Sequence, residues 1–177
     1  MFVISKSIKL LALGYTLGFS LVSPALGGET SQIVKTECPD LSGYYFSVTP
    51  IVRLGGTTIA QKVVNGHSEF TFTERNSEGK AEAQHDIFIA DGATHNYFSY
   101  GRYAAACKDG ALIVQLSYMI PESDHFAASF DGTKTYSTYL QNGIRYLSVE
   151  VNGSTKIASA PTATPVIGKY SARKIKN

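Results

Sequence analysis

Apolar and polar side chains alternate with a period of two over most of the chain beyond residue 40. Phe70 and Phe72 share one face of a short segment, and Val114 and Leu116 share one face of another. This alternation is typical of β-strands that are buried on one side. No segment beyond residue 27 shows the periodicity of an amphipathic helix. The pattern predicts strands over about 42–49, 57–64, 67–74, 82–90, 95–106, 111–118, 125–130, 134–140, 144–151, 154–159 and 166–175.

Asn-Gly and Asp-Gly pairs recur between these segments. Such pairs supply the positive φ angles that tight two-residue hairpin turns require. They predict turns at Asn65-Gly66, Asp91-Gly92, Asp109-Gly110, Asp131-Gly132, Asn142-Gly143 and Asn152-Gly153, with a further turn at Glu78-Gly79.

Short strands joined by hairpins predict an all-β fold, and we expect an antiparallel up-and-down β-barrel of about eight to ten strands. A β-sandwich is the alternative. Sandwiches of the Greek-key type need long crossover connections, whereas nearly every connection here is a predicted hairpin. Pro161 and Pro165 interrupt strand pairing near the end of the chain, because proline has no backbone N–H to donate.

The start of the chain has a different pattern. Lys6 and Lys9 precede an apolar run over 10–22, which is followed by small residues. This is typical of a cleavable secretory signal peptide, which we place at 1–27, although cleavage two residues earlier fits as well. The run is shorter than the roughly 20 residues that span a bilayer, so no stable membrane insertion is expected after cleavage. A single domain over 28–177 would then be periplasmic or secreted.

Charge excludes one class of partner. The formal net charge of +2 falls to nearly zero once the two lysines of the signal are removed. No acidic residue follows Glu150, so the end of the chain is a short basic tail. A tail of this kind is more typical of a solubilising segment than of a nucleic-acid footprint. We expect no nucleic-acid partner and a monomeric protein.

Two cysteines, Cys38 and Cys107, remain in the mature chain. An even number in an oxidising compartment favours a disulfide between them, with two unrelated thiols as the alternative. The bridge would close a loop of about 70 residues and stabilise the fold by roughly 4 kcal/mol.

The segment Cys38-Pro39-Asp40-Leu41-Ser42-Gly43-Tyr44-Tyr45, ahead of a hairpin meander, resembles the opening of the lipocalin-like (calycin) barrels. In that family a glycine and an aromatic residue on the first strand plug one end of the barrel, and Gly43 with Tyr44 or Tyr45 matches them. The chain departs from the family pattern in having no tryptophan and no counterpart of the C-terminal helix. The resemblance implies a barrel with an internal ligand site.

Motifs for catalysis are absent from the sequence. His85-Asp86 and Asp124-His125 each place an imidazole beside a carboxylate, but the four histidines lack the spacing of zinc motifs. No serine lies in a Gly-x-Ser-x-Gly elbow, and no glycine-rich phosphate loop is present. We predict no catalytic residue, no metal site and no cofactor. Enzymatic activity stays open, because two carboxylates on separate strands leave no linear signature.

Aromatic residues are the most informative feature for function. The chain has 11 tyrosines and 9 phenylalanines, which serve either as core or as ligand contacts. The leading hypothesis is an exported binding protein that holds a small apolar or amphipathic ligand inside its barrel. The predicted ligand-binding residues are Tyr44, Phe46, Phe70, Phe72, Val114 and Leu116. The alternatives are a protein-interaction or inhibitor module with a filled core, and a small outer-membrane barrel.

Overall fold

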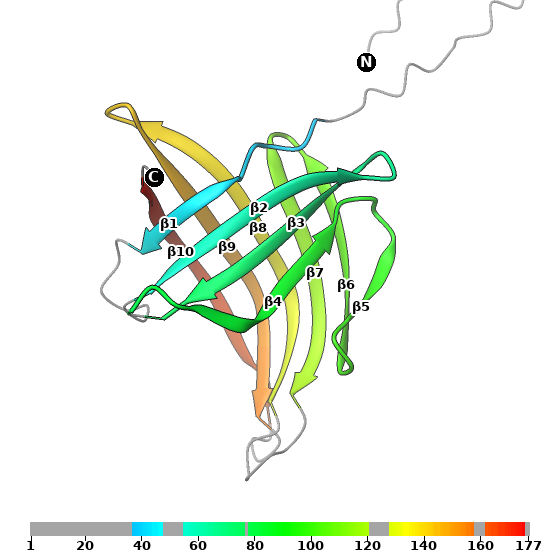
Figure 1. The fold of residues 1–177 in the computed structure, drawn as a ribbon. Helices are drawn as coiled ribbons and strands as arrows, with labels where there is room; N and C mark the ends of the chain where they lie inside the picture. Colours follow the sequence, from blue (N-terminus) through cyan, green and yellow to red (C-terminus); the bar gives the residue numbers. More distant parts are fainter. Residues whose placement is uncertain (1–36, 48–54, 77, 121–127, 158–161, 176–177) are drawn as a thin grey trace, which may run out of the picture. The chain divides into compact units, whose positions relative to one another are not determined.

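The computed structural model describes residues 37–47, 55–76, 78–120, 128–157 and 162–175 (Figure 1). The predicted signal peptide lies outside these residues, as does His125. In the described part of the chain the secondary structure is all β, and no helix is long and apolar enough to cross a membrane.

The described strands form one antiparallel sheet in which each strand pairs with neighbours of opposite direction. Its order is β4-β3-β2-β1-β10-β9-β8-β7-β6-β5, so the chain runs up and down except where the last strand returns beside the first (Figure 1). The strands are β1 Gly43–Ser47, β2 Gly56–Val64, β3 His67–Arg75, β4 Ala81–Ile89, β5 Thr94–Tyr97, β6 Gly101–Lys108, β7 Ala111–Ile120, β8 Ala128–Gln141, β9 Ile144–Ile157 and β10 Thr164–Ile175.

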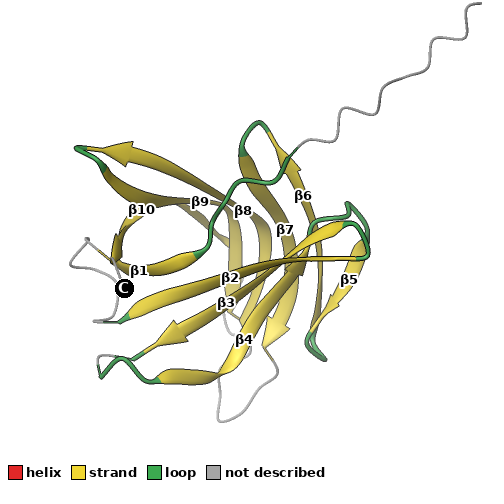
Figure 2. Ribbon diagram, turned by 45° about the horizontal axis from the view of Figure 1, so that its top comes forward, coloured by secondary structure: helices red, strands yellow, loops and turns green. Residues whose placement is uncertain are grey.

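The sheet curls strongly, so that β2 and β3 face β8 and β9 across an interior (Figure 2). Phe72 of β3 and Tyr136 of β8 meet there, with ring centroids 4.7 Å apart. The predicted antiparallel meander is confirmed, but the strand ladder does not close into a complete barrel. The two end strands, β4 and β5, are not paired with each other.

Side chains bridge the gap between these end strands instead of backbone hydrogen bonds. The Tyr97 hydroxyl of β5 donates to an Asp86 carboxylate oxygen of β4 at 2.8 Å. The backbone N–H of Ile89 in β4 donates to the hydroxyl of Tyr103 in β6 at 3.2 Å. We call this line of side-chain contacts between β4 and β5–β6 the seam.

Three of the predicted turn pairs have the expected geometry. Asn65 and Gly66 both have positive φ, of 52° and 83°, and the pairs at 109–110 and 142–143 repeat the pattern. Two positive φ angles in a two-residue loop define the type I′ hairpin turn, whose twist matches that of the flanking strands. At Asp91-Gly92 and Glu78-Gly79, only the glycine has positive φ.

Two predicted turns are wrong. Asp131-Gly132 and Asn152-Gly153 lie inside the long strands β8 and β9, where Gly132 is the direct partner of Gly153. A Cβ at Gly153 would come 2.5 Å from the Asp131 carbonyl oxygen, so the two backbones approach too closely for any side chain. The Phe130 ring occupies the space beside both glycines. Glycine here allows close strand approach rather than reversal of the chain.

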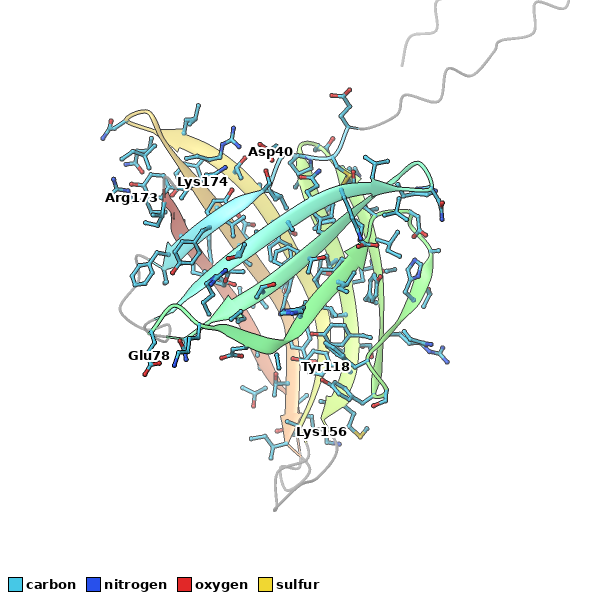
Figure 3. All side chains as sticks on the ribbon, viewed as in Figure 1. Asp40, Glu78, Tyr118, Lys156, Arg173 and Lys174 are labelled. Carbon is cyan, nitrogen blue, oxygen red and sulfur yellow. A yellow bond between two sulfur atoms is a disulfide. The ribbon has the colours of Figure 1, made fainter. Side chains whose placement is uncertain are left out.

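One end of the interior is packed. There the predicted Cys38–Cys107 disulfide is confirmed, with the two Cα atoms 5.1 Å apart. Cys38 and Cys107 pack against the hydrophobic core of the interior, in which Leu41 and Phe70 are fully buried. Lys174 crosses this end and donates to the Ser42 carbonyl oxygen at 2.6 Å. Figure 3 shows Asp40 and Lys174 at this end, which we call the closed end, and Glu78 at the opposite, open end.

Candidate ligand cavity

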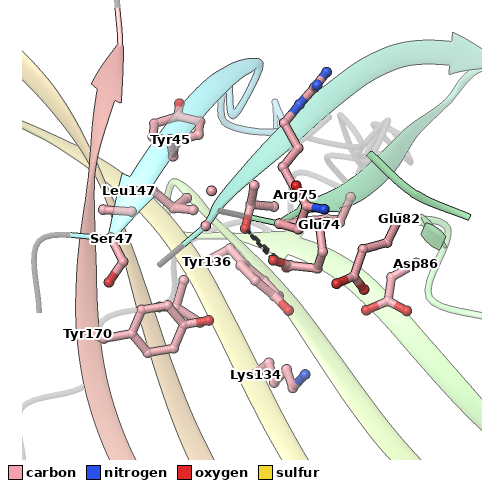
Figure 4. A pocket seen from close by; sticks show the side chains of 17 residues that line it. Tyr45, Ser47, Glu74, Arg75, Glu82, Asp86, Lys134, Tyr136, Leu147 and Tyr170 are labelled. Atoms are coloured by element: carbon pink, nitrogen blue, oxygen red, sulfur yellow. Dashed lines mark hydrogen bonds between the residues drawn. The ribbon is translucent and has the colours of Figure 1, made fainter. Parts of the chain in front are cut away.

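A cavity of about 620 Å³ lies in the open end of the interior (Figure 4). Its walls come from β1–β4 on one side and from β8–β10 on the other. The lining residues are Tyr45, Ser47, Gly55, Gly56, Thr57, Phe72, Glu74, Arg75, Asn76, Glu82, Asp86, Lys134, Tyr136, Leu147, Val149, Tyr170 and Ala172.

Strand register aligns one wall of the cavity. Tyr136 of β8 is the direct partner of Val149 in β9, and Val149 is the partner of Tyr170 in β10. Direct partners in adjacent strands point to the same face of a sheet, so these three side chains form a row across the wall. The row brings together residues that are far apart in the sequence.

The deep part of the cavity is apolar. Leu147 and Val149 are buried, and Phe72 packs against Tyr136 from the opposite wall. Towards the opening the lining becomes polar, because Glu74 continues the inward face of β3 after Phe70 and Phe72. The register between β3 and β4 shifts between Thr73 and Arg75, as at a β-bulge. Such a shift changes the direction in which the neighbouring side chains point.

Three carboxylates line the β3–β4 wall, those of Glu74, Glu82 and Asp86, with the ammonium of Lys134 on β8 (Figure 4). Glu74 accepts a hydrogen bond from the Thr57 hydroxyl at 3.0 Å. Partial burial raises the pKa of Glu74, although its side chain still reaches solvent.

Asp86 accepts a hydrogen bond from the Tyr97 hydroxyl at the seam. Burial, and after it the charge of Asp86, raises the pKa of Tyr97. Tyr97 therefore remains a neutral donor.

Tyr136 is the most unusual polar group of the site. The residue is 5 % exposed, and its hydroxyl faces the cavity (Figure 4), where it makes no hydrogen bond to another described residue. Burial raises the pKa of Tyr136 well above its ordinary value, so the hydroxyl is neutral and keeps its proton to donate. Burial also raises the pKa of Tyr170, to about 12. The cavity thus offers neutral hydroxyls beside carboxylates.

Aromatic rings continue from the cavity along the seam. Phe72 contacts Phe88, which lies 6.1 Å from Tyr97 and 5.1 Å from Tyr103 between ring centroids. Tyr97 then contacts Tyr118 at 5.4 Å. Aromatic pairs at these separations stabilise a fold beyond their area burial. They hold the two unpaired edges together where the backbone does not.

The predicted ligand-binding residues divide into three groups. Phe72 lines the cavity. Phe70, Val114 and Leu116 face the interior but are packed within the core. Tyr44 and Phe46 lie on the outer face, where Phe46 is 40 % exposed.

The assignment of Tyr44 and Phe46 to the interior is therefore wrong. Both faces of β1 carry an aromatic residue, so alternation alone cannot say which face is inside. Tyr45 is inside and fully buried. Tyr44 instead covers Gly56 on the outer face, and the guanidinium carbon of Arg75 lies 5.7 Å from the centroid of its ring.

The sequence prediction missed Tyr136, Tyr170, Glu74, Asp86 and Lys134 as site residues. Alternation places Tyr136 on the same face as Lys134, which is the one signal that points to them. The three described histidines, His67, His85 and His95, do not line this cavity. The His95 Nε2 atom lies 2.9 Å from an Asp91 carboxylate oxygen. Among the residues the structure describes, no three His, Cys, Asp or Glu side chains are grouped so as to hold a metal ion.

Comparison with known proteins found no matching family model, no matching curated protein and no matching solved structure. The resemblance to lipocalin-like barrels stays a prediction.

Proposed function

We propose that this protein binds a small amphipathic molecule in the cavity at the open end of its curled sheet. The observation that carries the proposal is the graded lining, with apolar residues at depth and hydroxyl and charged groups at the opening. Small-molecule sites in proteins are concave, mostly apolar and supplied with a few polar groups that orient the ligand. The volume of about 620 Å³ lies in the range of such sites, roughly 300–1,000 Å³.

The buried core beside the cavity supports the proposal. Leu41 and Phe70 are fully buried, and the disulfide ties Cys38 to β6. A wall that is ordered before the ligand arrives loses little conformational entropy on binding. The apolar tail of a ligand would lie against Phe72, Leu147 and Val149, while its polar end would meet the hydroxyls and charges at the opening.

The disulfide is consistent with an oxidising, exported location. We propose more specifically that the protein acts in the periplasm or after secretion, where it would carry or capture its ligand as a monomer. Cell fractionation tests this: the protein is expected in the soluble exported fraction. Recovery with outer membranes would contradict it and favour the membrane-barrel alternative.

Native mass spectrometry of protein purified from its own cells tests ligand binding. We expect an added mass that disappears after denaturation and refolding. In the variant Ala172→Phe, a phenyl ring enters the cavity from β10, and the added mass should be lost. Ile167→Phe is the matched control, because Ile167 lies on the same strand but is 81 % exposed.

Urea denaturation must show both variants folded before their masses are compared. An unmodified mass for the wild-type protein, together with no change in melting temperature across a panel of amphipathic compounds, would contradict the proposal. That result would favour the interaction or inhibitor module.

A further inference from the structure

The charges that line the cavity are unequal. Glu74, Glu82 and Asp86 contribute three carboxylates, and Lys134 contributes one ammonium. Arg75 also borders the cavity, but its guanidinium is engaged elsewhere. It donates to the Thr58 hydroxyl at 2.8 Å and to the Gly79 carbonyl oxygen at 2.7 Å. Three carboxylates against two cationic groups leave the cavity lining with a net negative charge, although the chain without its predicted signal peptide is nearly neutral.

A second observation points to a ligand in the same space. The Tyr136 residue is 5 % exposed, and its hydroxyl opens onto the cavity, where it makes no hydrogen bond to another described residue. A hydroxyl that faces a cavity without a protein partner is available to a polar group of a ligand. The rings of Tyr45, Tyr136 and Tyr170 also line the cavity. The faces of aromatic rings attract cations through their quadrupole.

We infer that the ligand is an organic cation: an amine or quaternary ammonium group carried on an apolar chain. This inference rests on the proposed binding function and specifies its ligand. The cationic group would lie between the carboxylates of the β3–β4 wall and the tyrosine rings. The apolar chain would extend towards Leu147 and Val149. A bare metal ion fits poorly, because hard cations require several oxygen ligands converging at about 2.0–2.6 Å, and the described residues form no such group.

Three probes of equal chain length test the inference by calorimetry: decyltrimethylammonium, decanol and decyl sulfate, each kept below its micelle concentration. The carboxylates should attract the cation and repel the sulfate, so we expect the cation to bind about tenfold more tightly than decanol, a factor worth 1.4 kcal/mol. Decyl sulfate should bind most weakly. Added salt should reduce the differences in affinity between the three probes, because salt screens the charges at the opening.

Variants that remove one charge each test which side chains attract the cation. Glu82→Gln and Asp86→Asn should each weaken binding of the cation severalfold and change binding of decanol by a smaller factor. Lys134→Gln should strengthen binding of the cation. Glu150→Gln is the matched control, because it makes the same change in net charge on an exposed residue outside the cavity.

The outcomes separate the inference from the proposed function. If decanol binds and Ala172→Phe abolishes its binding, but the cation shows no advantage, the ligand class is wrong and the binding function stands. If decyl sulfate binds most tightly, the inference is also overturned. If none of the three probes binds the folded wild-type protein, both proposals fail.

Discussion

The closed and open ends of the interior are built from the same strands and yet differ in what their side chains do. On β3, Phe70 is 0 % exposed at the closed side, whereas Glu74 lies four residues on at the opening and reaches solvent. On β8 and β10, the side chains that line the interior likewise become polar at Lys134 and Tyr170. Large apolar side chains fill one end, and hydroxyl and charged side chains leave the other hollow.

Stability and binding are therefore separated along the strands. The closed end holds the disulfide and fully buried residues such as Leu41 and Phe70, so substitutions there should mainly change the free energy of unfolding. The open end holds groups whose burial is costly, so substitutions there should mainly change ligand affinity.

Phe70→Ala should lower the free energy of unfolding by about 3–5 kcal/mol, because it deletes a fully buried ring and leaves a cavity. Tyr170→Ala at the opening should cost less than about 1 kcal/mol, because that side chain is already 36 % exposed. Urea denaturation followed by circular dichroism measures both. Equal losses would contradict the division into two ends.

Replacing Cys38 and Cys107 together by alanine should lower the free energy of unfolding by about 2–4 kcal/mol, since the bridge no longer restricts the unfolded chain. Reduction of the wild-type protein should give the same shift in the urea midpoint, which serves as the control. Binding of an amphipathic probe at the open end should persist in the folded variant. Loss of binding at full folding would show that the two ends are coupled.

Gly153→Ala should lower the free energy of unfolding by about 1–3 kcal/mol, because the new Cβ would meet the backbone of β8. Gly168→Ala is the matched control on the neighbouring strand, where a Cβ meets nothing within 4 Å. That change should be within about 0.5 kcal/mol of the wild type. Thermal melting of the two variants measures the contrast, and equal melting temperatures would refute the close approach of the two glycine backbones.

The two ends should respond to pH with opposite sign. At the closed end, hydrogen bonds from Ser42 and Arg145 hold the pKa of Asp40 at about 2. Ionised Asp40 therefore stabilises the fold above its ordinary pKa of 3.8, and this contribution is lost as pH falls towards 2. Because the side chain is 59 % exposed, Asp40→Asn should cost no more than about 1 kcal/mol at neutral pH.

At the open end, burial raises the pKa of Glu74 above its ordinary value. The protonated form is favoured by the fold, so its contribution is present below the ordinary pKa and is lost as pH rises through the raised value. Glu74→Gln should therefore stabilise the protein slightly at neutral pH, by less than about 0.5 kcal/mol. Urea midpoints between pH 2 and 7 measure both variants, and a stability loss for Glu74→Gln at pH 7 would contradict the sign.

Local chemistry predicted part of this structure well. Asn65-Gly66 and the pairs at 109–110 and 142–143 form the expected turns, because positive φ at both positions is a property of the residues themselves. The same logic failed at Gly132 and Gly153, where glycine meets a tertiary requirement for close approach. The face of β1 was also undecidable from alternation, since Tyr44, Tyr45 and Phe46 follow one another. Alternation also could not identify the residues that line the cavity. Of the six predicted ligand-binding residues Phe72 lines it, and the prediction left out Tyr136.

Short-range signals in the sequence were enough for the all-β character and most of the strand faces, because period-two alternation and turn residues act over a few neighbouring positions. The pairing of Cys38 with Cys107 followed from their even number. Tertiary structure decided the rest. Strand register placed Tyr136, Val149 and Tyr170 in one row, and the curl of the sheet set Glu74 and Asp86 near Lys134. Such neighbours depend on how distant strands align, and no short stretch of residues encodes that alignment.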